Sequence, residues 1–412
     1  MTKKSDAPAI RFKGFSDAWE QREVGDLLIE RSQQAPMSDE YPLMAFIANE
    51  GVAPKGERYD RSALVTDTVN KLYKKTEKGD FIYSSNNLET GSIGLNKYGK
   101  ACISPVYSIF EPTGIADSDF LGRRLVRKDF INAMVKWRQG VIYGQWRIHE
   151  SDFLKIEISV PSVEEQRKIG AYLDQLDNLI TLHQRKFEKL TNVKKSMLEK
   201  MFPQNGSSYP EIRFKGFTDP WEQRKLGDMM NVTSVKRIHQ SDWTDSGVRF
   251  LRARDIVAAA NNEEPDDYLY ISKEKYEEYS TLSGKVGVSD LLVTGVGTIG
   301  VPYLVRNLEP LYFKDGNIIW FQNSDKIDGK FLFYSFSAEQ IQGFINESAG
   351  IGTVGTYTIE SGKKTPISLP NQIEQAKVGE FFQQLDNLIT LHQRELEKLQ
   401  NIKKSMLEKM FV

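Results

Sequence analysis

The chain has 412 residues, 40% hydrophobic and 11% aromatic, which is enough for more than one hydrophobic core. Its formal net charge of −1 argues against a protein that is covered with basic residues and binds nucleic acid without regard to sequence. Cys102 is the single cysteine, which excludes an intramolecular disulfide and a multi-cysteine metal site and leads us to expect a cytoplasmic protein. Because no window approaches the roughly 20 apolar residues of a membrane span, we expect none.

The chain is internally duplicated. Residues 10–15 (IRFKGF) and 19–22 (WEQR) return at 212–217 and 221–224, and residues 175–185 recur letter for letter at 384–394. A further block, 194–202, recurs at 403–411. Between these blocks the two halves differ almost completely, which indicates two dissimilar modules on one duplicated scaffold.

Each dissimilar module contains a β-rich run, a turn and a second run. In the first, residues 79–83 lead to the turn at 91–94, and in the second, residues 290–294 lead to the turn at 297–300. We expect a strand–turn–strand hairpin in both. Residues 295–300 also match the dinucleotide pattern G-x-G-x-x-G, but Pro302 argues against the helix that this pattern must open.

The first module ends in a basic stretch. Residues 123–147 hold seven lysines and arginines against one acid, Asp129. Such a stretch is either a surface that contacts phosphates or a solvated helix face, and the sequence leaves both interpretations open.

Two long helices are predicted over 162–202 and 371–412. Ser162 and Asn371 are N-cap candidates, and each stands three residues before a glutamate, Glu165 or Glu374, that can reach back in a capping box. Apolar positions then step by four and three, as in a heptad seam. Because each helix follows a globular module of the same chain, antiparallel pairing is expected, with 203–209 as a linker.

Polar residues interrupt both heptad seams at matching positions. His183 and His392 are interpreted as register-fixing residues, because they lack the neighbouring carboxylates or cysteines of a zinc site. Lys194 and Lys403 are expected to lay their stems along the coil and hold their amines outside it.

This order of motifs, found twice, resembles the specificity subunits of type I restriction-modification systems. The marks that carry the resemblance are 160–169 (VPSVEEQRKI) and 369–375 (LPNQIEQ), the G-[ST]-I-G turns, and WEQR near each start. The second copy departs from the usual pattern by having one acid before the glutamine. The resemblance covers essentially the whole chain.

The resemblance implies an α+β protein that reads double-stranded DNA. Residues 1–161 and 210–370 would be target-recognition domains, each reading one half of an asymmetric, interrupted site. The helices would set the gap and dock two methylation subunits, and restriction subunits would join them. Adenine methylation, translocation and cleavage, with S-adenosylmethionine, ATP and Mg²⁺, would belong to the partner chains, and this chain would bind no cofactor or metal and carry no catalytic residue.

Candidate DNA contacts are side chains that can form paired hydrogen bonds to base edges or reach phosphates. In the first module they are Asn86, Asn87, Lys97, Arg123, Arg124, Arg138, Tyr143, Gln145 and Arg147. In the second module they are Arg252, Arg254, Thr298, Tyr303, Gln342, Thr353, Thr356 and Tyr357. The alternative function is a two-module adaptor that binds proteins and uses the helices as a spacer, and an enzyme built on the glycine-rich run is a third.

Overall fold

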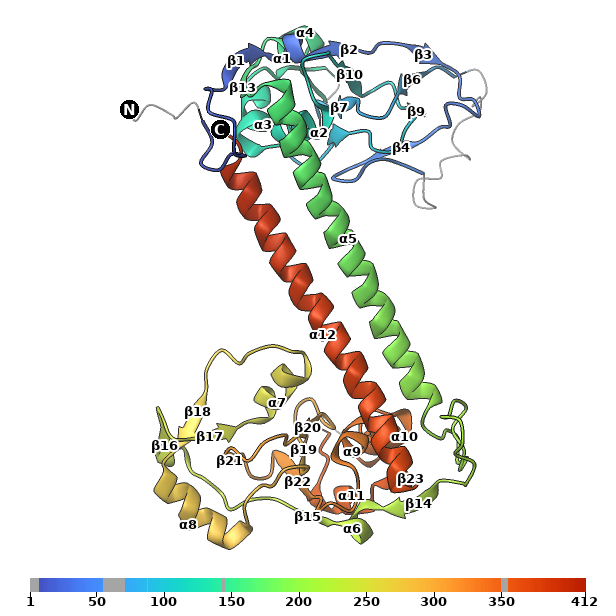
Figure 1. The fold of residues 1–412 in the computed structure, drawn as a ribbon, viewed down its shortest axis with the longest axis vertical. Helices are drawn as coiled ribbons and strands as arrows, with labels where there is room; N and C mark the ends of the chain where they lie inside the picture. Colours follow the sequence, from blue (N-terminus) through green and yellow to red (C-terminus); the bar gives the residue numbers. More distant parts are fainter. Residues whose placement is uncertain (1–6, 55–70, 87, 143–144, 350–354) are drawn as a thin grey trace. The chain divides into compact units, whose positions relative to one another are not determined.

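A computed structural model of the chain describes residues 7–54, 71–86, 88–142, 145–349 and 355–412, with the side chains of 139–142 and 145–147 left out. The chain forms two compact units, Met1–Leu182 with Leu396–Val412, and His183–Glu395 (Figure 1). Each unit combines β-sheets with parts of two long helices, so the expected α+β class is confirmed. In the described part of the chain, no helix has the length and apolar character of a membrane span.

Unit 1 is built around a four-stranded sheet in the order β2-β10-β7-β8. Its strands are β2 (Leu28–Glu30), β10 (Ser108–Pro112), β7 (Phe81–Tyr83) and β8 (Ile93–Leu95). The other strands are β1 (Glu20–Glu23), β3 (Gln34–Ala35), β4 (Ala45–Ile47), β5 (Gly51–Ala53), β6 (Tyr73–Thr76), β9 (Ala101–Ile103), β11 (Gln139–Ile142), β12 (Gln145–Arg147) and β13 (Glu157–Val160). The short helices are α1 (Val24–Leu27), α2 (Ser118–Arg124), α3 (Lys128–Val135) and α4 (Glu150–Leu154).

The first predicted hairpin is confirmed in this sheet, because β7 pairs antiparallel with β8. All three residues of β7 are buried, since the strand lies inside the sheet and is covered by aromatic side chains. The ring of Phe153 packs on Phe110 and Tyr83 at centroid distances of 4.6 and 4.9 Å. Phe411, near the chain end, stacks on Phe120 at 5.3 Å, so the last residues complete this core.

Unit 2 repeats the plan with the sheet order β15-β22-β19-β20. These strands are β15 (Asn231–Thr233), β22 (Ile318–Gln322), β19 (Leu291–Thr294) and β20 (Pro302–Leu304). The others are β14 (Glu222–Lys225), β16 (Trp243–Thr244), β17 (Val248–Leu251), β18 (Leu269–Ile271), β21 (Leu311–Phe313) and β23 (Pro366–Leu369). Its helices are α6 (Leu226–Met229), the 3-10 turn η3 (Gln240–Asp242), α7 (Ala253–Ala260), α8 (Lys273–Ser283), α9 (Gly329–Ser335), α10 (Glu339–Ser348) and α11 (Ile359–Lys364).

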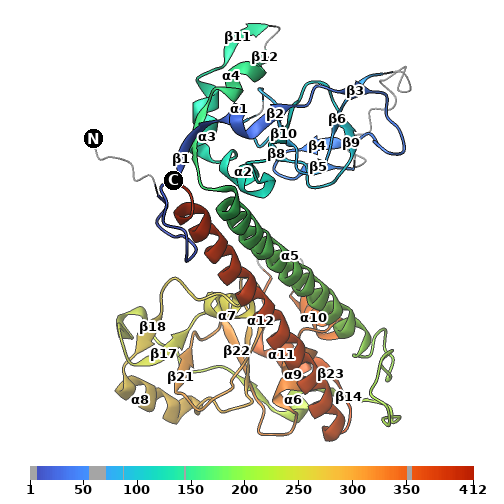
Figure 2. The ribbon, with the colours of Figure 1, turned by 45° about the horizontal axis from the view of Figure 1, so that its top comes forward.

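Unit 2 has a second four-stranded sheet, β16-β18-β17-β21. This outer sheet is not part of the plan that the two units share. Helix α8 covers this sheet, and Tyr276 of α8 lies 6.4 Å from Tyr312 of β21 (Figure 2). The second predicted hairpin is also confirmed, because β19 pairs antiparallel with β20.

The two long helices are α5 (Val163–Lys200) and α12 (Gln372–Lys409), and each contributes residues to both units. In unit 2, His183 contacts His392 with 3.1 Å between the two Nδ1 atoms, and Lys194 contacts Asp386 at 2.6 Å. As the residue number rises on α5 it falls on α12, which confirms the antiparallel pairing there. The Lys194 amine thus pairs with a carboxylate of the other long helix, and in unit 1 Lys403 likewise pairs with Asp177 at 2.5 Å.

Candidate nucleic-acid interface

Each unit contains the same buried clasp between the repeated IRFKGF arm and the start of a long helix. In unit 1, Arg11 donates from Nε and Nη2 to the two carboxylate oxygens of Glu165, at 2.9 and 2.7 Å. In unit 2, Arg213 makes the same fork to Glu374 at 2.7 and 2.8 Å. The side chain of Glu374 is 0% exposed, and its hydrogen bond raises the pKa of Arg213.

The clasp corrects part of the predicted capping box. The N-cap half is confirmed, because the amide of Glu165 donates to Ser162 Oγ at 3.4 Å and that of Glu374 to Asn371 Oδ1 at 3.0 Å. Both glutamate carboxylates, however, accept from the arginines rather than reaching back to the N-cap amide. A guanidinium that offers two donors in a fixed fork is a better partner for a buried carboxylate than one backbone amide.

The glycine-rich run in unit 2 is a tight turn between β19 and β20. Thr294 Oγ1 donates to the Thr298 carbonyl at 2.5 Å and accepts from the Val301 amide at 2.9 Å. Gln342 Nε2 donates to the Gly300 carbonyl at 3.0 Å, so this predicted contact residue ties the turn to α10. The run opens no helix, as the sequence indicated, and Thr298 is exposed at its tip.

Four of the basic candidate residues in unit 1 have acidic partners. Arg123 donates to Asp177 at 2.8 Å, and Arg124, 8% exposed, lies 3.1 Å from Asp129. Burial lowers the pKa of Arg124. Arg138 binds Glu89 at 2.9 Å, and Lys97 binds Asp174 at 2.9 Å. These four predicted contacts are thus held by acids of their own unit, and Arg123 and Arg138 pair with acids from outside the basic stretch.

Five of the predicted DNA contacts lie outside the described residues or have side chains outside them. Asn87, Tyr143 and Thr353 fall outside the described residues, and Gln145 and Arg147 lie on β12 with their side chains outside them. Strand β12 pairs antiparallel with β11, with Gln139 opposite Arg147. Asn86 is half-buried in the turn after β7.

In unit 2, Arg252 is fixed by two aspartates. It donates to Asp255 Oδ1 at 2.9 Å and to Asp267 Oδ2 at 2.8 Å, and the Asp255 bond is the main reason that the pKa of Arg252 is raised. Arg254 also pairs with Asp267, yet its side chain is 61% exposed. Arg252 therefore shapes the loop, while Arg254 remains accessible from solvent.

The three remaining candidate DNA contacts of unit 2, which carry hydroxyl groups, differ in how far their side chains are exposed. Tyr357 is 1% exposed, and its hydroxyl shares a hydrogen bond of 2.5 Å with Thr365 Oγ1, so its side chain belongs to the core. Thr356, beside it, is exposed. Tyr303 is half-buried beside the core formed with β17 and β21.

Sequence reasoning missed one group of exposed cations. Lys236 and Arg237 lie in the loop between β15 and β16, and Arg237 is 68% exposed with Asp315 at 3.6 Å. The signal was present as the run Lys236-Arg237-Ile238-His239, which was too short to stand out in the charge count.

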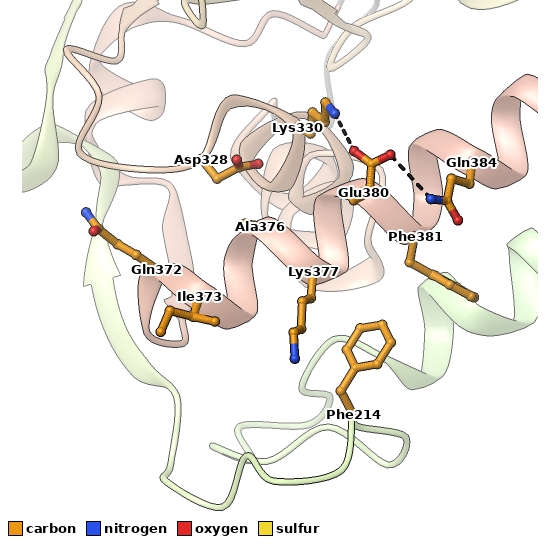
Figure 3. Close-up of a pocket in the computed structure, with 10 residues that line it drawn as sticks. All are labelled: Phe214, Asp328, Lys330, Gln372, Ile373, Ala376, Lys377, Glu380, Phe381 and Gln384. Atoms are coloured by element: carbon orange, nitrogen blue, oxygen red, sulfur yellow. Dashed lines mark hydrogen bonds and ion pairs between the residues drawn. The ribbon is translucent and has the colours of Figure 1, made fainter.

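A groove of about 820 Å³ runs along the first turns of α12 in unit 2 (Figure 3). Three of its polar side chains bind one another, because Glu380 accepts from both Lys330 and Gln384, at 2.5 and 3.4 Å. Phe214, Ile373 and Phe381 form its apolar side. Within the described ranges, no group of three or more histidine, cysteine, aspartate or glutamate side chains is arranged to hold a metal ion.

Comparison with known proteins identifies the duplicated architecture. The profile of the type I restriction modification DNA specificity domain matches the chain twice, over residues 17–192 and 218–401. The chain is 25% identical over 414 aligned positions to the type I restriction enzyme MjaVIII specificity subunit of Methanocaldococcus jannaschii, covering 94% of this chain and 91% of that protein. It is also 25% identical over 282 positions to the putative MjaX specificity subunit of the same organism, covering 64% and 60% of the two chains.

A solved structure shares the fold. The chain resembles the crystal structure of the type I restriction-modification S subunit from M. genitalium with a TM-score of 0.60 and 14% identity, over 98% of this chain and 99% of that one. The two profile matches together cover most of the sequence and include the described strands of both units and most of both long helices. The chain therefore belongs to the family of type I restriction-modification specificity subunits, which give their complexes DNA specificity and are not themselves catalytic.

Proposed function

We propose that the chain reads an asymmetric, interrupted double-stranded DNA site, with residues 1–161 reading one half and residues 210–370 the other. The observation that carries this proposal is one repeated scaffold that bears two different outer sheets. The buried arginine–glutamate clasp occurs in both units with the same geometry. The outer sheets differ: β3-β6-β9 in unit 1 has three strands, whereas β16-β18-β17-β21 in unit 2 has four. Two unlike modules on a repeated base suit two unlike half-sites.

We further propose that the chemistry belongs to partner chains in the cytoplasm. Two methylation subunits would dock on helices 162–202 and 371–412 and transfer a methyl group from S-adenosylmethionine to adenine. Restriction subunits would use ATP and Mg²⁺ for translocation and cleavage. The near-neutral charge of this chain fits such a division, because the partners would supply much of the attraction to phosphates.

The candidate DNA contacts of unit 2 fall into exposed side chains and side chains that are held within the unit. Thr298 at the hairpin tip, Thr356 and Arg254 are exposed and remain proposed contacts, joined by Lys236 and Arg237. We assign Arg252 and Gln342 to holding their loops, since Arg252 donates to Asp255 and the side-chain nitrogen of Gln342 donates to the Gly300 carbonyl. We do not propose Tyr357 as a DNA contact, because its side chain lies in the core.

The test is a methylome of a host that carries the complete complex. An asymmetric modified sequence with an unmodified gap is expected, whereas an uninterrupted palindrome would contradict the proposal. Exchanging residues from about 221 to 369 for the second module of another family member should then change one half-site and leave the other intact. The reciprocal exchange of the first module is the control. Loss of both halves by a complex that still assembles would contradict independent reading.

A single residue can be tested in the same assay. Arg147→Ala should cost about 1–3 kcal/mol and relax the base preference at one position if Arg147 contacts a base. It should weaken binding equally for all sequences if it contacts a phosphate. Unchanged affinity and modification would remove Arg147 from the interface.

A further inference from the structure

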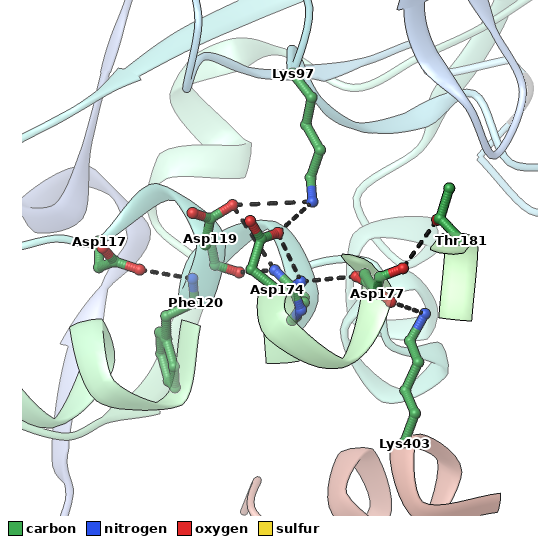
Figure 4. Close-up of polar contacts among 9 residues, drawn as sticks. Lys97, Asp117, Asp119, Phe120, Asp174, Asp177, Thr181 and Lys403 are labelled. Carbon is green, nitrogen blue, oxygen red and sulfur yellow. Dashed lines mark hydrogen bonds and ion pairs between the residues drawn. The ribbon is translucent and has the colours of Figure 1, made fainter. Parts of the chain in front are cut away.

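Two equivalent aspartates, Asp177 on α5 and Asp386 on α12, each join three parts of one unit. They occupy the same place in the block that is identical in both helices. In unit 1, Arg123 of α2 donates to one carboxylate oxygen of Asp177 at 2.8 Å. Lys403 of α12 lies 2.5 Å from the other oxygen, as Figure 4 shows for the Asp177–Lys403 pair. The carboxylate thus links the recognition domain to both long helices.

Unit 2 builds the same junction with a different donor. Tyr334 of α9 donates its hydroxyl to one oxygen of Asp386 at 2.6 Å, and Lys194 of α5 lies 2.6 Å from the other. The Tyr334 side chain is 0% exposed and its ring packs 5.1 Å from Phe382. Burial and the neighbouring carboxylate raise the pKa of Tyr334, so it stays a hydrogen-bond donor.

The aspartate makes one of several contacts between the domain and the helix, and it is the contact farther from the start of the helix, beyond the Lys330–Glu380 pair. At the near end, the amide of Asp328, the N-cap of α9, donates to Gln375 Oε1 at 3.1 Å. Gly379 lies between the two points, where an added Cβ would stand 2.9 Å from the Phe331 amide nitrogen. Unit 1 has the matching near end, because the Asp117 amide donates to Gln166 Oε1 at 3.0 Å. Loss of the aspartate contact would leave the side of the domain that is farther from the start of the helix less firmly held.

We propose that Asp177 and Asp386 are positioning residues that fix the angle of each recognition domain on the long helices, and so fix the gap length between half-sites that the complex accepts. The inference rests on the proposed function. A recognition domain of about 150 residues has a radius of gyration of roughly 15 Å. A rotation of about 13° therefore moves its reading surface by about 3.4 Å, which is one base-pair step.

The experiment removes one donor and measures gap preference. Tyr334→Phe deletes the hydroxyl and keeps the packed ring. The variant is assembled with its methylation subunits and given duplexes that carry the native half-sites at gaps from two pairs shorter to two pairs longer than native. Methyl transfer to each duplex is measured as kcat/KM. We expect about a tenfold loss at the native gap and a relative gain at gaps one pair longer or shorter.

Matched variants separate positioning from general stability. Glu380→Gln removes an exposed ion pair of the same α9–α12 contact, with 40% and 51% exposed partners, and should leave the gap profile unchanged because such pairs contribute little. In unit 1, Arg123→Met should broaden the profile, and Arg123→Lys, which keeps a charged donor, should restore a narrow one. A uniform loss at every gap in Tyr334→Phe, or a profile identical to wild type, would overturn the inference.

The experiments distinguish a failure of the proposed function from a failure of the positioning role. If the wild-type complex modifies a site without a gap, the proposed function is wrong before any variant is made. If the wild-type complex modifies an interrupted site with a sharp gap preference that Tyr334→Phe and Arg123→Met both retain, only the positioning role is wrong.

Discussion

Breaking the buried clasp in unit 2 should have a large and specific cost. Arg213 is 13% exposed and its partner Glu374 is 0% exposed, so Arg213→Met leaves a carboxylate in the interior without its counterion. Removing one member of a buried pair costs about 3–5 kcal/mol, more than the pair itself contributes. For a unit of this size, 1 kcal/mol corresponds to about 2–4 °C in Tm, so a loss near 3 kcal/mol predicts a decrease of roughly 6–12 °C.

Differential scanning calorimetry of the full chain measures this effect. Adding Glu374→Gln to Arg213→Met should recover most of the loss, because a neutral amide can be buried at lower cost than an unpaired charge. Arg11→Met is the matched variant in unit 1, where Arg11 is also 13% exposed and Glu165 is 1% exposed. A decrease below about 2 °C for Arg213→Met would refute the reasoning, since an exposed ion pair would give that result.

Three further predictions address the helices. Burial and the neighbouring His183 lower the pKa of His392 from 6.5 in the folded chain. The contribution of His392 to folding stability is therefore complete above that value and is lost as the pH falls towards the lowered pKa. The Tm decrease on going from about pH 7.5 to 5.5 should therefore be smaller in His392→Gln, and an equal decrease would contradict this. Gly379→Ala should destabilise unit 2 in urea despite the higher helix propensity of alanine, because its Cβ would meet Asp328 Oδ1 at 2.8 Å. Gly343→Ala on α10, where nothing lies within 4 Å, should stabilise it, and stabilisation by both would refute the packing argument. Inserting one heptad into each long helix at matching points should add about 10 Å and abolish modification of the native site, since that length is about three base pairs and roughly 100° of duplex rotation. Normal modification by the assembled variant would show that the helices do not set the gap.

The helices and hairpins were predictable because their signals are local or repeated. The N-cap residues Ser162 and Asn371 and the heptad spacing put the helices at 162–202 and 371–412, and the structure has them at Val163–Lys200 and Gln372–Lys409. Both hairpins follow from β-rich runs that flank a glycine turn. Each of these patterns is complete within about 40 residues or fewer, so no distant partner had to be known.

Partners distant in sequence were not predictable in the same way. Arg11 and Glu165 are 154 residues apart, and nothing near Glu165 shows that an arginine satisfies its carboxylate. The basic stretch has the same difficulty, because Arg138 and Glu89 are 49 residues apart. A charge count along the chain records the excess of arginines and cannot record the acids that the fold brings to them, which is why the ion pairs of Arg123 and Arg138 were not predicted.

The attachments of the two recognition domains also explain how one scaffold can hold unlike modules. The junction uses Arg123 in unit 1 and Tyr334 in unit 2, yet the acceptor on the helix is an aspartate in both. A carboxylate has two oxygens that accept from a guanidinium, an ammonium or a hydroxyl, so it tolerates a change of donor without a change of backbone. Where the helix residue does differ, the donor differs with it, as Lys97 pairs with Asp174 and Arg306 with Gln383. An exchanged module should therefore function when it brings a donor that matches the aspartate, and a module with an apolar residue at that place should assemble but read its half-site at more than one gap length.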